Sequence, residues 1–192
     1  MLNRIIFSLV LCSILGCTQD NVLREKGYPR VYLPKKTYKK YTAECNYSFD
    51  IPSYCTIENK EYFRNEKLTS DSCWANIVFN GFNGKLHLSY KYYPNQETLT
   101  KLMEESYKLT SKHTIKATYI KDSIIDTDSI KGLVYTVGGN AASAKQFILT
   151  DYKHKFVRGA MYFSNTPNAD SMKPVIDYVN QDIDRIIKTF KF

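Results

Sequence analysis

The stretch of sequence that decides the fold is KLHLSYKYYPNQETLTKLM, residues 85–103. Its first half alternates apolar and polar side chains, which is the period of a half-buried β-strand. One face of that strand carries Leu86, Leu88, Tyr90 and Tyr92, and the other carries Lys85, His87, Ser89 and Lys91. After Pro94 the apolar residues recur at spacings of three and four, and Asn95 can cap the helix that this period predicts. The stretch therefore predicts a strand followed by an amphipathic helix that covers a sheet.

Strand patterns continue on both sides of this stretch. We predict further strands at residues 38–41, 47–51, 74–79, 119–125, 132–137, 144–151 and 155–163. Residues 80–84 and 151–154 are typical of the turns that join antiparallel strands. A final amphipathic helix follows residue 170, with Asp170 or Ser171 as its cap and Pro174 in its first turn.

The order of these elements predicts the fold class. Strands, a helix, strands and a helix with mostly short connections indicate an α+β fold, an antiparallel β-sheet covered by helices. The order resembles the Mog1/PsbP-like sandwich, in which helices cover both faces of a central antiparallel sheet. Residues 28–192 are enough for a single α+β domain with its own core. A likeness of fold does not by itself predict a function.

The first sixteen residues predict a lipoprotein signal peptide. A short basic start is followed by an apolar run at residues 5–15 and by Gly16. The tetrad Ile14-Leu15-Gly16-Cys17 resembles the bacterial lipobox, whose cysteine is acylated. The apolar run is well short of the roughly 20 residues that a membrane-spanning helix needs. A plain secretory signal is the main alternative to a lipoprotein signal.

Lipidation at Cys17 would make membrane lipid the first partner of the chain. Two or three acyl chains, such as palmitate, give stable attachment, so residues 17–27 would form a lipidated tether. Thr18, and not Asp, follows the cysteine. This favours the outer membrane, with the protein facing the periplasm, over the inner membrane.

The chain is basic, with 27 Lys and Arg against 19 Asp and Glu and a net charge of +8. An exported protein does not meet nucleic acid, so nucleic acid is excluded as a partner. The densest basic group is Lys35, Lys36, Lys39 and Lys40. It is either a solvated surface or a contact for anionic lipid, acidic glycan or an acidic protein.

Three cysteines remain in the mature chain besides the lipidated one. Cys45, Cys55 and Cys73 allow one disulfide and one free thiol in an oxidising compartment. We favour Cys45–Cys73, because each of these residues directly precedes a predicted strand while Cys55 lies in or just after a turn. The spacings fit no usual zinc pattern and no histidine is near in sequence, so we predict no metal site.

No motif in the sequence predicts catalysis or a cofactor. Residues 138–143, GGNAAS, are rich in small residues but lack the Lys-Ser/Thr ending of a P-loop, so a hairpin or bulge turn is favoured. No nucleophile-elbow motif accompanies the histidines. His87 falls on the polar face of a strand, His113 at a helix end where its charge would favour the helix dipole, and His154 in a turn.

The sixteen tyrosines are the strongest hint of a ligand surface. Tyr90 and Tyr92, together with His87, are the candidate ligand contacts, for example in a glycan-stacking surface. Aromatic residues on strands are more often part of the core, so this hypothesis competes with a purely structural interpretation.

Several short segments, taken in order, resemble the gliding motility lipoprotein GldD family. They are Gly27-Tyr28-Pro29-Arg30, Cys45 with Tyr47-Ser48-Phe49, Cys73-Trp74, His87-Leu88-Ser89-Tyr90-Lys91, Lys112-His113-Thr114, Gly139-Asn140-Ala141-Ala142-Ser143, Gln146-Phe147, Arg158-Gly159-Ala160 and Pro167-Asn168. The resemblance covers nearly the whole chain, and Cys55 is not part of the pattern. It implies a membrane-anchored component of gliding motility, linked with the type IX secretion apparatus, and it brings no enzymatic activity or cofactor.

Two functional hypotheses follow from the sequence. The first is a non-catalytic interaction or assembly component, held at the membrane by Cys17, whose partners are proteins of the gliding and secretion machinery. The second is an enzyme or small-ligand carrier that acts on a cell-envelope glycan or lipid. A concave pocket with convergent polar groups would be required for the second hypothesis.

Overall fold

The computed structural model describes residues 27, 30–59 and 73–192, so the predicted signal peptide, Cys17 and most of the predicted tether lie outside the described residues. The α+β prediction is confirmed. The strands are β1 (Tyr38–Thr42), β2 (Ser48–Pro52), β3 (Cys55–Asn59), β4 (Ala75–Phe79), β5 (Gly84–Tyr92), β6 (Ala117–Asp126), β7 (Lys131–Gly139), β8 (Lys145–Thr150) and β9 (Lys155–Phe163). The helices are α2 (Gln96–Ser111), the 3-10 helix η2 (Lys112–Ile115) and α3 (Ala169–Thr189).

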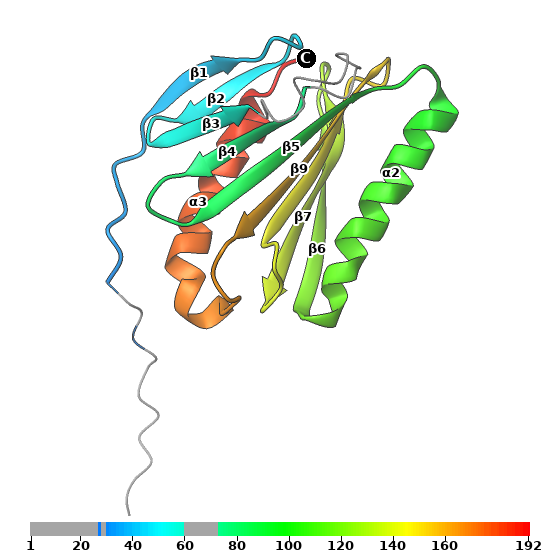
Figure 1. Ribbon diagram of the computed structural model, residues 1–192. Coiled ribbons are helices and arrows are strands. Elements are labelled where there is room, and N and C mark those ends of the chain that lie inside the picture. The colour runs from blue at the N-terminus through cyan, green and yellow to red at the C-terminus, as the bar shows by residue number, and fades with distance from the viewer. Residues whose placement is uncertain (1–26, 28–29, 60–72) are drawn as a thin grey trace, which may run out of the picture.

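Within the described residues, seven strands form one antiparallel sheet in the order β3-β4-β5-β9-β8-β7-β6, and β1 and β2 form a separate ribbon (Figure 1). The centre of the sheet is the pair β5 and β9, which are in register over nine positions, from Gly84 with Phe163 to Tyr92 with Lys155. The last strand of the chain therefore lies in the middle of the sheet. It joins the strands that precede α2 to those that follow it.

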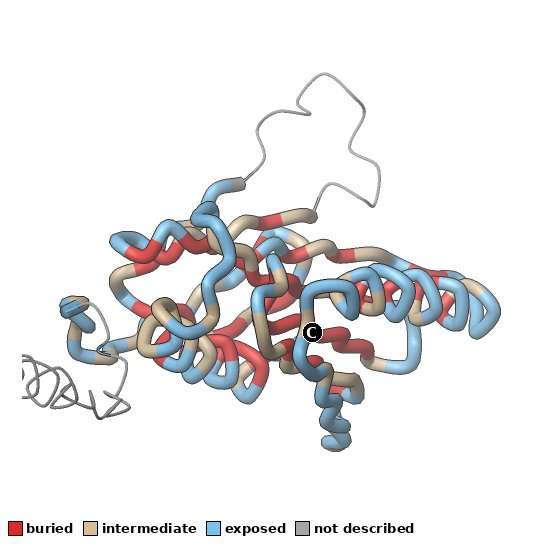
Figure 2. The backbone as a smooth tube through the Cα atoms, turned by 90° about the horizontal axis from the view of Figure 1, so that it is seen from below, coloured by how far each residue is buried: buried red, intermediate tan, exposed pale blue. Residues whose placement is uncertain are grey.

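The two helices cover opposite faces of this sheet, as the sequence predicts (Figure 1). Successive residues of a strand point to opposite faces. On β8, Phe147 and Leu149 accordingly pack in the core with α3, while Ile148 packs with Leu99 of α2 on the other side. Figure 2 shows these buried positions concentrated along the strands and the inward sides of the helices. The specific likeness to the Mog1/PsbP-like sandwich stays a prediction.

The β1–β2 ribbon closes one edge of the larger core. Phe49 and Ile51 of β2 are each 1% exposed, and the ring of Phe49 stacks on Phe190 at 5.8 Å. Tyr47 stacks on Phe190 at 5.6 Å and on Tyr90 of β5 at 5.7 Å. These aromatic contacts bury a large apolar area between the ribbon, the end of α3 and the main sheet.

The start of α3 differs from the sequence prediction. Asn168 is the cap, because its side chain accepts a hydrogen bond from the backbone N–H of Ser171 at 3.2 Å, so the prediction of Asp170 or Ser171 is wrong. The placement of Pro174 in the first turn is wrong for the same reason, since it is the sixth residue of a helix that begins at Ala169. Several residues here have side chains suited to capping, and only the extended backbone at Asn168 selects one of them.

The start of α2 agrees with the sequence prediction, whereas β3 does not. Asn95 caps α2 as predicted, accepting a hydrogen bond from the N–H of Thr98 at 2.9 Å. The sequence did not predict β3, which pairs with β4 at an edge of the sheet. Neither helix in the described part of the chain is long and apolar enough to cross a membrane.

Candidate functional site

The structure does not bring the three predicted ligand contacts together. Tyr90 is buried in the core against Tyr47, on the face of β5 that points to α3. Tyr92, 50% exposed at the end of the same strand, stacks on His154 at 5.2 Å. His87 points to the opposite face. These three side chains therefore do not line one ligand surface.

The face of the sheet that carries His87 also carries other polar side chains, which form two contacting groups. We call the two groups together the polar row, which consists of Asn76, His87, Tyr162, His113, Arg158 and Gln146. The register explains why these residues share a face, because directly opposed residues of antiparallel strands point the same way. Asn76 opposes His87, while His87 and Gln146 both oppose Ala160. Ala160 of β9 thus lies between His87 of β5 and Gln146 of β8, and its small side chain stands between the two ends of the row.

Two imidazole rings flank one tyrosine ring at the centre of the polar row. The ring of Tyr162 lies 5.7 Å from that of His87 and 6.2 Å from that of His113. His87 is exposed, and its Nδ1 lies 2.7 Å from Oδ1 of Asn76, a hydrogen bond that places the proton on Nδ1. His113 comes from η2, directly after α2, so the end of that helix closes over this part of the sheet.

The other end of the polar row is buried. Gln146 is 1% exposed, and its Oε1 accepts hydrogen bonds from Thr110 at 3.1 Å and from the guanidinium of Arg158. Its Nε2 has no hydrogen-bond partner among the described residues. A buried amide donor without an acceptor costs free energy. The hydrogen bonds that Oε1 of Gln146 accepts from Arg158 and from Thr110 of α2 hold the side chain in place despite this cost.

The electrostatics of the polar row correct the interpretation of His113. Burial lowers the pKa of the imidazole, and the nearby Arg158 lowers it further. The neutral ring is favoured, so the expected stabilisation of a charged His113 by the helix dipole is not its role. The row thus combines the Arg158 cation with several hydrogen-bonding groups. Among the described residues no group of three His, Cys, Asp or Glu could hold a metal ion.

A second polar cluster fastens the start of the described chain to α3. We call it the latch, and it consists of Lys36, Tyr38, Tyr54, Tyr178 and Asp182. The Asp182 carboxylate is fully buried and accepts hydrogen bonds from Lys36 Nζ at 2.8 Å, Tyr38 Oη at 2.7 Å and Tyr54 Oη at 2.6 Å. A buried carboxylate is tolerated only with such compensation.

The latch holds the backbone as well as the side chains. Lys36 Nζ also donates to the carbonyl of Tyr178 at 2.7 Å and lies 3.8 Å from the centre of its ring. The hydroxyl of Tyr178 donates in turn to the carbonyl of Pro34 at 2.5 Å. Burial and the hydrogen bond to Asp182 raise the pKa of both Tyr38 and Tyr54. The segment that enters the fold is thus fixed along the helix.

Sequence reasoning missed the latch, because it treated Lys36 as one of a basic group at the surface. One signal was present in the sequence. Asp182 lies three residues after Val179 and four before Ile186, on the apolar stripe of the last helix. A lone carboxylate on a buried stripe predicts a specific cationic or hydroxyl partner.

The cysteines pair as the sequence favours. A disulfide joins Cys45 and Cys73, whose Cα atoms are 6.0 Å apart, a usual separation for a disulfide. Cys55 is a buried free thiol, 1% exposed. Burial, together with the nearby Asp182, raises the pKa of this thiol to about 12. Such a thiol is inert at neutral pH.

A cleft of about 240 Å³ lies between the β7–β8 turn, β6 and the start of α3. Gly138 and Gly139 end β7 and residues 140–144 connect it to the antiparallel β8, so the interpretation of residues 138–143 as part of a hairpin connection is confirmed. Gly139 adopts a φ of +86°, and the side chain of Asn140 accepts a hydrogen bond from the N–H of Ala169 at 2.9 Å. The lining is mixed, with small residues from the turn and polar residues such as Asn165 and Asn180.

Comparison with known proteins gives one family. A family model described as "Gliding motility lipoprotein GldD" matches residues 18–192 of the 192-residue chain. No curated protein matches the chain.

Proposed function

The chain belongs to the gliding motility lipoprotein GldD family, and from this premise we propose that it is a non-catalytic interaction component of the gliding machinery, linked to type IX secretion. The family places the protein in the cell envelope and in gliding motility. Our proposal adds the mode of action, which is to bind protein components of that machinery while attached to a membrane.

The observation that carries the proposal is the composition of the polar row. His87, His113, Gln146 and Arg158 come from four of the separate segments on which the family resemblance rests, and the fold assembles them on one face of the sheet. Their side chains are arranged as hydrogen-bonding and stacking groups. We propose that the part of this row not covered by α2, around His87, Tyr162 and Arg158, contacts the machinery, because a fixed arginine and aromatic rings are typical of binding surfaces.

Attachment to the membrane is the second part of the proposal. We propose that residues 1–16 are removed as a signal peptide, that Cys17 is acylated, and that residues 17–27 form the tether of a single domain at 28–192. Thr18 after the acylated cysteine supports the outer membrane, with the domain facing the periplasm.

Replacement of the acylation site tests whether attachment is part of the function. An exported Cys17→Ala protein should accumulate without its anchor and fail to restore gliding to a deletion strain. The wild-type chain at the same level should restore it. Full gliding with the unanchored protein would contradict the proposal.

Replacement of polar-row residues tests the binding surface. His87→Ala and Arg158→Ala in the acylated protein should reduce recovery of motility or secretion components from solubilised envelopes. Lys101→Ala, on the exposed side of α2, is the matched control and should leave recovery unchanged. Unfolding midpoints close to wild type would show that the variants fold. Equal recovery with all three variants, or no recovery of machinery with the wild type, would contradict the proposal.

The cleft supports a second candidate function, the binding of a small envelope glycan. It is concave, and its mixed lining includes the polar side chains of Asn165, Asn168 and Asn180. Chitooligosaccharides are a suitable probe. Saturable shifts of the amide resonances of Gly138 and Gly139 would support binding, and their absence up to millimolar probe would reject it.

A further inference from the structure

The segment that enters the fold is strongly basic and partly apolar at its surface. Residues 27–43 contain five lysines and arginines and no acidic residue. Arg30, Lys35, Lys39 and Lys40 are exposed, and Lys36 is held in the latch. Tyr32 is 85% exposed and Leu33 is 39% exposed. We call residues 30–40 the basic entry segment.

The exposed lysines of this segment form no ion pair among the described residues. Lys35, Lys39 and Lys40 form no ion pair with any described residue, whereas Lys36 is paired with Asp182. Asp50 lies opposite Lys40 in the β1–β2 register, but its carboxylate is bound by Arg185 at 2.6 Å. Within the described part of the chain, the charge of these three lysines is therefore not paired with a carboxylate.

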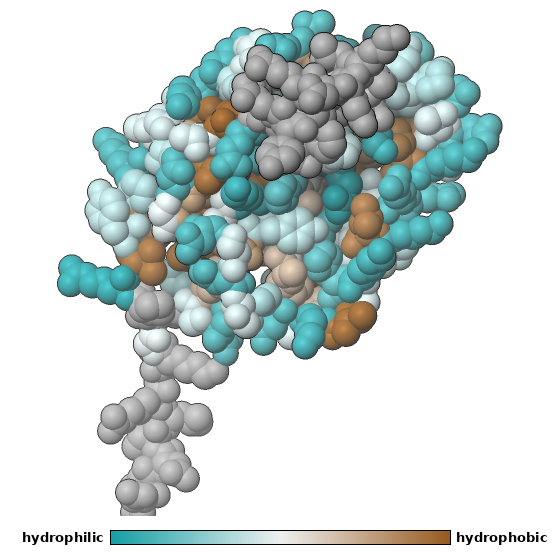
Figure 3. All heavy atoms as spheres, viewed as in Figure 1, coloured by the Kyte–Doolittle hydropathy of each residue, from teal (hydrophilic) through white to brown (hydrophobic). Residues whose placement is uncertain are grey.

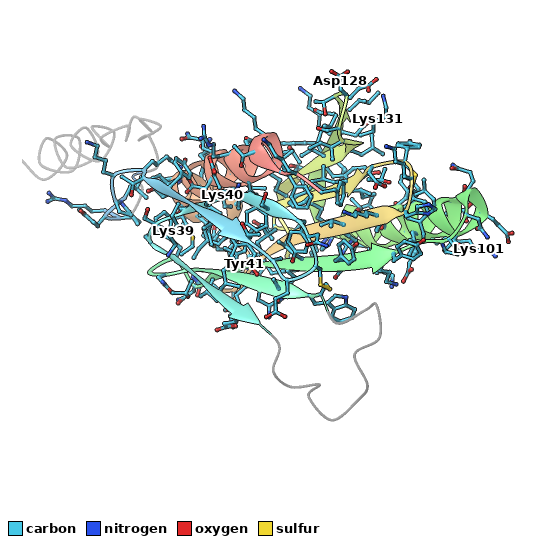
Figure 4. The ribbon with its side chains drawn as sticks, turned by 90° about the horizontal axis from the view of Figure 1, so that it is seen from above. Lys39, Lys40, Tyr41, Lys101, Asp128 and Lys131 are labelled. Atoms are coloured by element: carbon cyan, nitrogen blue, oxygen red, sulfur yellow. A yellow bond between two sulfur atoms is a disulfide. The ribbon has the colours of Figure 1, made fainter. Side chains whose placement is uncertain are left out.

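The latch determines where these charges lie. Because Pro34, Lys36 and Tyr38 are all fixed to α3, the exposed cations around them are held at the place where the chain enters the fold. Figure 3 shows hydrophilic and hydrophobic side chains next to one another there, at the lower left beside the N-terminal trace. Figure 4 shows Lys39 and Lys40 on β1, far from Lys101 at the other end of the molecule.

We infer that the basic entry segment binds the headgroups of anionic phospholipids and holds the domain against the bilayer surface. Each lysine or arginine close to an anionic membrane adds attraction, and tyrosine favours the interface between lipid and water. Arg30 follows Cys17 by thirteen positions, a reach of at most about 45 Å, so an anchored chain keeps this segment near the bilayer. The inference that a bilayer lies close to this segment depends on the proposed acylation of Cys17. The affinity of the segment for anionic phospholipid does not depend on it.

Vesicle binding by the unacylated chain tests the inference independently of lipidation. The probe is mature protein from residue 17 with Cys17→Ser, sedimented with vesicles of phosphatidylcholine alone or mixed with phosphatidylglycerol. We expect binding to the mixed vesicles in about 0.1 M salt and its loss in about 1 M salt, because salt screens exposed charges. Little binding to neutral vesicles is expected.

Charge reversal locates the contact on the molecule. Lys35→Glu, Lys39→Glu and Lys40→Glu together should lower the partition coefficient onto anionic vesicles at least about tenfold. Lys101→Glu, Lys108→Glu and Lys112→Glu together remove the same charge from the α2 end and should have a much smaller effect. A Gln series at 35, 39 and 40 repeats the test should the Glu series fail to fold. Equal losses in both sets, or equal binding to neutral and anionic vesicles, would overturn the inference.

These outcomes do not depend on the proposed function. A chain that binds vesicles but is dispensable for gliding would retain the membrane surface and reject the motility role. A chain that restores gliding but does not bind anionic vesicles would support the motility role and reject the membrane-binding surface.

Discussion

The ammonium group of Lys36 lies 2.8 Å from the carboxylate of Asp182, a residue 146 positions later in the chain. The carboxylate is fully buried in α3, and the lysine is the cation that balances it. The pair thus connects the entry of the chain to the helix that covers one face of the sheet. A surface pair would contribute little, but a buried pair that loses one partner leaves an uncompensated charge.

We expect Lys36→Met and Asp182→Asn each to lower the free energy of unfolding by about 3 kcal/mol. Lys36→Met leaves the buried Asp182 carboxylate without its counter-charge, and Asp182→Asn leaves the partly buried Lys36 ammonium without its carboxylate. Urea unfolding of the Cys17→Ser mature chain measures the effect. The double variant should lose clearly less than the sum of the two single losses, because the two residues interact directly.

An exposed ion pair provides the control for this prediction. Lys101 pairs with Glu97 one turn earlier on α2, and both side chains are more than two-thirds exposed. Lys101→Met should change the free energy of unfolding by less than about 0.5 kcal/mol. A loss at Lys36 no larger than that at Lys101 would show that the latch does not stabilise the fold.

The disulfide predicts a definite pattern of alkylation. Without reduction, the native mature chain from residue 17 with Cys17→Ser should take up no label, because Cys55 is buried and Cys45 is bonded to Cys73. Unfolding without reduction should expose one thiol, and unfolding with reduction three, as mass spectrometry would show. Three labelled thiols without reduction would contradict the disulfide. Cys45→Ser with Cys73→Ser should cost about 3 to 4 kcal/mol, because the cross-link restricts the unfolded chain.

The buried thiol predicts a loss of stability at alkaline pH. The folded chain raises the pKa of Cys55 to about 12 from an ordinary value of 9.0, so the unfolded chain loses this proton first as the pH rises. Stability from this group is complete below pH 9 and falls between pH 9 and 12, by at most about 1.4 kcal/mol for each pH unit. Unfolding from pH 8 to 11 should show a shallower decline for Cys55→Ala. Parallel declines would rule out a contribution from the thiol.

Substitution of two glycines should distinguish the destabilisation caused by a steric clash from that caused by a left-handed backbone conformation. A Cβ on Gly132 would lie 1.9 Å from the carbonyl oxygen of Ile148 on the neighbouring strand, which cannot move without breaking the β7–β8 pairing. Gly132→Ala should therefore cost about 3 kcal/mol or more. Gly81 has a φ of +84° but open space around it, so Gly81→Ala should cost only about 1 kcal/mol. Similar losses of stability in urea for both variants would contradict this reading of the sheet.

The elements with a strong period were predictable from the sequence. Leu86, Leu88 and Tyr90 alternate over a long strand, and Asn95 precedes a helix with a clear apolar stripe, so β5, α2 and the cap agree with expectation. β3 was not predictable, because its five residues follow β2 after a short turn and pair with a partner twenty residues away. The order of the strands depends on that kind of pairing between distant segments.

The polar row was only partly predictable for the same reason. His87 stands out on the polar side of its strand, and the sequence predicts it as a candidate contact. Nothing local places it beside His113, which arrives at the end of a helix, or on the same face as Arg158, seventy-one positions later. The hypothesis grouped His87 with Tyr90 and Tyr92, but the alternation of the strand places His87 on the other face.

The sequence by itself determined the α+β class, the favoured disulfide, the predicted acylation site and the resemblance to the gliding family, because each depends on local periodicity or on short ordered segments. Only the tertiary structure decided which polar groups meet. Lys36 looked like a solvated surface charge, and it proved to be the counter-ion of a carboxylate buried in the last helix. The environment of a charge depends on residues that are distant in sequence, and only the packing of α3 against the entering chain determines it.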